Sequence, residues 1–256
     1  MASPYQTKTF SSDGLTIAYF DEGEGDPILL IHGFASSKEM NWVTPGWVDT
    51  LLKDGRRVIA LDNRGHGESE KIYEKEAYGA DVMSGDAARL IDHLGLERVD
   101  VMGYSMGARI SAFLSLAHPE KVRSVVLGGL GIGLVRGVGG QEEIASALEA
   151  PSLDDVQTSL GRRFRKFADQ TKSDLKALAL CIRASSNRIT PETIARLQPP
   201  ALIAVGTTDD IAGSAEELAD LIPGAKVCPI PGRDHMLAVG DKAYKTGVLA
   251  FLHERP

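Results

Sequence analysis

Short apolar runs alternate along the chain with stretches that have the periodicity of amphipathic helices. Most runs are continuous rather than interrupted by polar residues, which is typical of strands buried on both faces. The candidate strands are 16–20, 27–31, 57–61, 98–102, 122–127, 201–205 and 225–230, and the helical stretches are 80–94, 106–117, 214–222 and 240–253. This order predicts an α/β fold with a mostly parallel, doubly wound sheet. The Gly-rich turn in "TIAYFDEGEGDPILLI" predicts that the first two strands form an antiparallel hairpin.

One interval breaks the alternation, because the fifth and sixth candidate strands are much farther apart than an ordinary crossover requires. This interval carries helix signals, among them 141–149 and 172–184. We therefore predict a small helical cap at 129–198, inserted between a first part of the core at 1–128 and a second part at 199–256.

The predicted cap opens with 128–140, in which seven of thirteen residues are glycine. A phosphate-binding loop is one interpretation, but the i, i+2, i+5 glycine spacing of a dinucleotide loop is absent. We favour a flexible hinge, since glycine adopts unusual backbone angles without steric cost. The basic run 162–166 fits an anion-binding patch or, as we favour, the solvated face of a cap helix.

The composition is that of a folded enzyme-sized protein, with 43% hydrophobic and 25% charged residues among 256. Its net charge of −7 argues against nucleic acid as a partner, because that affinity comes from clustered Lys and Arg. The N-terminus shows no secretory signal, and no apolar run is long enough to span a membrane. Cys181 and Cys228 are too few for a disulfide framework, and we expect both in the core. We predict a cytoplasmic location.

A serine lies between two glycines where an apolar strand gives way to an apolar helix, in "VDVMGYSMGARIS" at 99–111. A G-x-S-x-G sequence alone is weak, but the strand, sharp turn and helix around it are typical of a nucleophile elbow. We expect Ser105 to have strained backbone angles that expose its hydroxyl. Side chains at Gly103 or Gly107 would collide where the strand and the helix approach.

A serine hydroxyl needs a base, and usually an orienting carboxylate, before it can act as a nucleophile. Asp209 and Asp210 follow the strand 201–205, and His235 follows the strand 225–230. The carboxyl ends of parallel strands meet at one edge of a sheet, so these residues can converge on Ser105. Between the two acids we favour Asp209, since Asp210 can instead cap the next helix.

Attack on a carbonyl also requires hydrogen-bond donors for the oxyanion that forms. The backbone N–H groups of Phe34, after "LLIHG", and of Met106, after the serine, are placed to serve. We interpret His32 as structural. Together with Phe34 and Met106, the residues that we expect to line an apolar pocket under the cap are Trp42, Trp47, Leu130, Ile132 and Leu134.

Taken in order, several segments resemble the α/β-hydrolase family in its cofactor-free esterase, haloperoxidase and epoxide-hydrolase-like branch. They are "DGLTIAYFDEGEGDPILLIHGF", "RVIALDNRGHGES", the serine turn, "HPEKVRSVVL", "GTTDD" and "GRDHM", and they cover most of the chain outside the cap. The resemblance implies Ser105 as nucleophile, Asp209 as acid and His235 as base, with the oxyanion donors named above. It also implies that His66 belongs to a structural loop.

A serine nucleophile predicts acyl transfer, because attack on saturated carbon would leave a stable ether, whereas relatives that perform it use an aspartate. We expect a carboxylesterase that cleaves small to medium acyl esters through an acyl-enzyme intermediate, without a cofactor. Lactonase, C–C hydrolase and perhydrolase reactions stay open as alternatives, and so does a ligand receptor with little turnover. The six histidines lack metal-ligand spacing, so we expect no metal.

Overall fold

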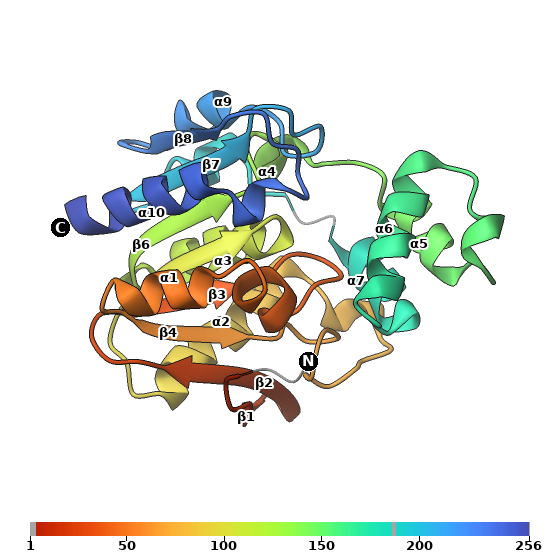
Figure 1. Ribbon diagram of the computed structural model, residues 1–256, viewed down its shortest axis with the longest axis horizontal. Helices are drawn as coiled ribbons and strands as arrows, with labels where there is room; N and C mark the ends of the chain where they lie inside the picture. Colours follow the sequence, from red (N-terminus) through yellow and green to blue (C-terminus); the bar gives the residue numbers. More distant parts are fainter. Residues whose placement is uncertain (1–3, 186–187, 256) are drawn as a thin grey trace.

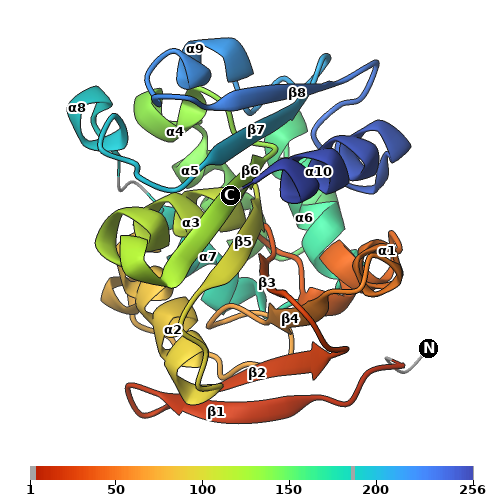
Figure 2. The same ribbon diagram turned by 90° about the vertical axis from the view of Figure 1, so that its left-hand side faces the viewer.

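The computed structural model describes residues 4–185 and 188–255, whose strands form one eight-stranded sheet (Figures 1 and 2). The order across the sheet is β1-β2-β4-β3-β5-β6-β7-β8. From β4 to β8 all neighbours are parallel, whereas β2 is antiparallel to both β1 and β4. The strands are β1 (Lys8–Ser12), β2 (Leu15–Glu22), β3 (Pro27–Ile31), β4 (Arg57–Leu61), β5 (Val99–Tyr104), β6 (Val122–Gly128), β7 (Ala201–Gly206) and β8 (Lys226–Ile230).

The predicted hairpin between the first two candidate strands is wrong. β2 pairs with β1, a strand that the apolar pattern did not reveal, and β4 lies between β2 and β3. The hairpin turn is at Asp13 and Gly14, with φ angles of 49° and 81°. An Asp-Gly pair tolerates the positive φ that a tight hairpin turn requires, so the turn chemistry favours this pairing.

Helices cover both faces of the sheet (Figure 2). Alternate strand residues supply the two cores: Leu29 and Ile31 pack with α2, α3 and α9, whereas Ile28 and Leu30 pack with α1 and α10. The helices are α1 (Trp47–Lys53), α2 (Ala80–His93), α3 (Met106–Ala117), α4 (Gly133–Arg136), α5 (Gln141–Glu149), α6 (Ser159–Gln170), α7 (Leu175–Ala184), α8 (Pro191–Ile194), α9 (Ala215–Ala219) and α10 (Lys242–Glu254). In the part of the chain that the structure describes, no helix is long and apolar enough to cross a membrane.

The helices α5, α6 and α7 stand beyond the carboxyl ends of the strands, apart from the other helices (Figure 1). We call them the cap. They share a third apolar cluster, to which the core contributes Phe34 and Tyr78. The Gly-rich segment before the cap begins in close contact with the core, since Gly131 N–H donates to Ala212 O at 3.0 Å. A Cβ at Gly131 would lie 2.4 Å from Gly213 O, so here glycine permits a close approach.

The basic run in α6 is not simply a solvated face. Arg165 is buried, and its Nη1 donates to Ala147 O at 3.0 Å and to Ala150 O at 2.7 Å. These carbonyls end α5, so the guanidinium satisfies backbone groups that have no partner within that helix. Within the run, Lys166 is the exposed residue.

Candidate active site

Ser105 lies at the sharp turn that joins β5 to α3. Its φ and ψ angles are 56° and −111°, as the predicted strained turn requires. A Cβ at Gly103 would lie 2.1 Å from Gly107 O, and one at Gly107 would lie 1.9 Å from Ile31 O. Both contacts are with backbone, which cannot be moved cheaply, so the turn requires glycine on both sides of the serine.

The structure brings the three predicted side chains together at the carboxyl ends of β5, β7 and β8. Ser105 Oγ lies 2.9 Å from His235 Nε2, and His235 Nδ1 lies 2.8 Å from Asp209 Oδ2. A carboxylate only accepts hydrogen bonds, so Nδ1 carries the proton and Nε2 accepts from the serine hydroxyl. This tautomer leaves the imidazole ready to take the serine proton.

Asp209, rather than Asp210, contacts the imidazole. Its side chain is fully buried, and Oδ1 accepts hydrogen bonds from the N–H groups of Ile211 at 2.8 Å and Ala212 at 2.9 Å. Burial alone would raise the pKa of this carboxyl, but the bonds from His235 and from the two N–H groups hold it below its usual value. Asp209 is therefore charged at neutral pH and can stabilise an imidazolium beside it.

The loop that carries His235 is fixed by contacts on both sides of the imidazole. Tyr104 Oη donates to His235 O at 2.7 Å, which joins this loop directly to the residue before the serine. Asp234 Oδ1 accepts from the N–H groups of Met236 at 3.0 Å and Leu237 at 2.9 Å. The imidazole is thus positioned relative to Ser105 by the backbone as well as by its own hydrogen bonds.

The two residues predicted as oxyanion donors belong to different elements: Phe34 lies in the loop after β3, and Met106 begins α3. Both residues line the cavity beside Ser105. Among residues 4–185 and 188–255, neither backbone N–H has a hydrogen-bond acceptor. Two such donors beside one hydroxyl could bind an oxyanion that forms there.

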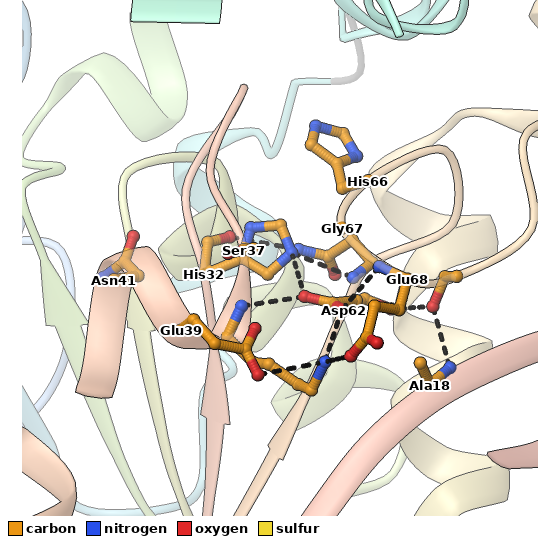
Figure 3. Close-up of polar contacts among 12 residues, drawn as sticks. Ala18, His32, Ser37, Glu39, Asn41, Asp62, His66, Gly67 and Glu68 are labelled. Atoms are coloured by element: carbon orange, nitrogen blue, oxygen red, sulfur yellow. Dashed lines mark hydrogen bonds and ion pairs between the residues drawn. The ribbon is translucent and has the colours of Figure 1, made fainter. Parts of the chain in front are cut away.

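The loop that carries Phe34 rests on a network of charges centred on the buried Asp62 (Figure 3). Lys38 is fully buried, and its Nζ lies 2.8 Å from Asp62 Oδ2, 2.6 Å from Glu68 Oε2 and 3.2 Å from Glu39 Oε1. The three carboxylates are close enough together to hold a metal ion, but the ammonium group already contacts all of them. We interpret this network as the support of the loop.

His32 and His66 lie side by side, with ring centroids 5.3 Å apart, and are both fully buried. His32 Nδ1 donates to Gly33 O at 2.7 Å and Nε2 accepts from Asn63 N–H at 3.0 Å, so both ring nitrogens are occupied. Burial lowers the pKa of His32 and lowers that of His66 to about 3, so both are neutral. This agrees with the structural role predicted for each.

Two cavities meet at Ser105. The large cavity has a volume of about 390 Å³, and its walls include Met106, Leu130 and the cap residues Ile144 and Cys181. The small cavity, of about 150 Å³, is lined by residues that include Tyr104, Asn41 and His235.

The predicted pocket wall is correct at Leu130, Phe34 and Met106 but wrong elsewhere. Trp42 and Trp47 are fully buried in the apolar core on the α1 face, where their ring centroids lie 6.4 Å apart. Leu134 is fully buried in the opposite core, and Ile132 contacts Gly213. Neither of these last two side chains lines either cavity.

The cap supplies wall residues that the sequence did not reveal. Phe164 lines both cavities, and Arg163 lines the large one, where its Nη1 lies 3.3 Å from both carboxylate oxygens of Asp210. The available signal was the helical periodicity of α6, which places Leu160, Phe164 and Phe167 on one face. Which way that face points depends on tertiary packing.

Comparison with known proteins agrees with this fold. A family model described as the alpha/beta hydrolase fold matches residues 26–192. A putative 2-succinyl-6-hydroxy-2,4-cyclohexadiene-1-carboxylate synthase from Bacillus subtilis is 35% identical over 118 residues, which are 45% of this chain and 41% of that protein. A 2-hydroxymuconate semialdehyde hydrolase from Pseudomonas is 35% identical over 127 residues, 50% of this chain and 44% of that protein. The chain thus spans less than half the length of these curated relatives.

Solved structures resemble the chain over nearly its whole length. A bromoperoxidase from Bacillus anthracis has a TM-score of 0.81 at 25% identity, with 97% of this chain and 100% of that chain covered. An esterase from Exiguobacterium antarcticum has a TM-score of 0.78 at 19% identity, with 94% and 97% covered. The second likeness, at this low identity, concerns the fold alone.

Proposed function

The chain belongs to the alpha/beta hydrolase family, and from this premise we propose that it is a serine carboxylesterase. The observation that carries the proposal is the hydrogen-bonded chain from Ser105 through His235 to the buried Asp209. The Ser105 hydroxyl opens onto two cavities whose walls are mainly apolar, and the charged residues Arg109, Arg163 and Asp210 also line the large one. A neutral ester with apolar substituents suits such a site.

In the proposed reaction, Ser105 Oγ attacks the ester carbonyl carbon while His235 Nε2 takes the hydroxyl proton. The N–H groups of Phe34 and Met106 bind the resulting oxyanion. The imidazolium then gives its proton to the alkoxy oxygen, the carbon–oxygen bond breaks and the alcohol leaves. Water attacks the acyl-enzyme with His235 again as base, and the carboxylic acid is released. Throughout, Asp209 holds the Nδ1 proton and stabilises the imidazolium.

The proposal is tested by the release of nitrophenol from p-nitrophenyl acetate, butyrate and octanoate. We expect turnover by the wild-type protein and a fall in kcat of about 10⁴-fold or more in Ser105→Ala, because the nucleophile is lost. Equal thermal unfolding of the two proteins would show that the substitution leaves the fold intact.

Two outcomes contradict the proposal. If Ser105→Ala turns over as fast as the wild type, the serine is not the nucleophile. If the wild type cleaves no ester, the carboxylesterase assignment fails, and a ligand receptor on the same fold gains support.

A further inference from the structure

The two cavities beside Ser105 are unequal and are divided by two aromatic rings. Phe34, Ser105 and Phe164 line both cavities. The Phe34 and Phe164 ring centroids are 5.9 Å apart, with the planes inclined by 59°. Phe34 follows β3 in the core and Phe164 belongs to α6 of the cap, so the dividing wall joins the two parts of the molecule.

The position of His235 indicates which cavity holds the alcohol side of the ester and which holds the acyl side. In ester cleavage the imidazolium must reach the oxygen of the departing alcohol to protonate it. His235 lines the small cavity and not the large one, whereas Met106, the proposed oxyanion donor, lines the large cavity and not the small one. The alcohol therefore leaves from the small cavity, and the acyl group extends into the large one.

We propose that this protein selects esters of a long or bulky apolar acid with a small alcohol. The inference rests on the proposed function. An apolar cavity of ~150 Å³ holds one benzene molecule, so a short or single-ring alcohol fits within the small cavity, whereas an extended alkyl chain would project from its open side into solvent. The large cavity has more than twice this volume, and side chains such as Leu130, Ile144 and Ile182 make its wall apolar.

Two isomeric esters test the assignment, since ethyl octanoate and octyl acetate have the same atoms and differ only in which side is long. We expect kcat/KM for ethyl octanoate to exceed that for octyl acetate by about tenfold or more, because several methylenes of the octyl group would lie outside the small cavity and lose apolar burial. A ratio of one or less overturns the inference. Cleavage of p-nitrophenyl esters without cleavage of ethyl octanoate overturns it too, while leaving the esterase proposal intact.

The dividing wall gives a matched pair of variants. Phe164→Ala joins the two cavities, so we expect the ratio to fall at least threefold through a gain with octyl acetate, and Phe164→Leu to give an intermediate ratio. Lys166→Ala changes an exposed residue of the same helix and should leave the ratio as in the wild type. An unchanged ratio in Phe164→Ala, in a protein that unfolds at the wild-type temperature, would show that Phe164 does not divide the site.

Discussion

The rim of the sheet and the cap contribute to the same cavities in different ways. We call the loops after β3, β5, β7 and β8 the rim. In the rim, the groups around Ser105 are held by further hydrogen bonds, such as those on Asp209 Oδ1 and on His235 O. The cap instead presents mainly apolar side chains, and its polar ties to the core include the exposed Arg163–Asp210 pair and a bond from Thr171 Oγ1 to Ala35 O. The proposed chemistry therefore depends on groups that hydrogen bonds hold in place, whereas substrate fit depends on the apolar side chains of the cap.

Asp209 and Asp210 give the strongest test of this difference between rim and cap. Asp209 contacts His235 in the rim, whereas Asp210 pairs with Arg163 of the cap. We expect Asp209→Asn to lower kcat by about 10³- to 10⁴-fold, because an amide favours the wrong imidazole tautomer. Asp210→Asn should have only a few-fold effect. A p-nitrophenyl butyrate assay on both variants decides the matter, and a larger loss at Asp210 would contradict this difference.

Two glycines, one at the rim and one in the segment before the cap, give a second test through the free energy of unfolding. Gly107→Ala places a Cβ against the carbonyl of Ile31, and we expect the free energy of unfolding to fall by about 3 kcal/mol or more. Gly139, in the segment that leads to the cap, has φ of +70° and no atom within 4 Å of a Cβ, so Gly139→Ala should cost about 1 kcal/mol. Urea unfolding measures both, and similar losses would show that the rim is no tighter than the cap segment.

Acid should weaken the core, through the buried His66 in the loop after β4, rather than the cap, whose helices contain no histidine. Burial lowers the pKa of His66 to about 3, so its contribution to stability is complete above the unfolded value of about 6.5 and is lost as the pH falls towards 3. Between about pH 6 and pH 3, we expect the free energy of unfolding to decrease by about 1.4 kcal/mol per pH unit through His66 alone. Urea unfolding at pH 7, 6 and 5 should give a shallower slope for His66→Phe than for the wild type or the exposed control His253→Gln.

The smallest effect belongs to the ion pair between cap and rim. Arg163 and Asp210 are 34% and 64% exposed, and exposed pairs contribute about 0.2–1 kcal/mol. We therefore expect Arg163→Gln to lower the free energy of unfolding by less than about 1 kcal/mol, and 1 M salt to reduce that difference further. A loss above 2 kcal/mol would mean that the cap is held to the rim chiefly by charge.

The rim was predictable from the sequence because each part has a local signal. The strand, turn and helix around Ser105 fix its position, and Asp209 and His235 each follow an apolar strand. Parallel pairing then brings the three strand ends to one edge without any further information. Even the choice between two neighbouring acids agrees with the observed contact.

The cap and the sheet edge were less predictable, because their contacts are set by tertiary packing. Arg165 and Lys166 are neighbours in one basic run, yet only the second is exposed. Trp42 and Trp47 are as apolar as any pocket residue, and only the fold shows that they face the core. β1 was missed because its half-exposed sequence has no continuous apolar run, so the hairpin was assigned to the wrong partner.

The cap is inserted between adjacent parallel strands, since the chain leaves β6 at Gly128 and enters β7 at Ala201, which lies opposite Val125 of β6. An insertion with neighbouring endpoints can be exchanged as a module without reordering the sheet. A different cap can therefore replace this one at the two junctions, either in evolution or by protein engineering. The resulting proteins would keep the reacting groups unchanged and differ in the substrates that they bind.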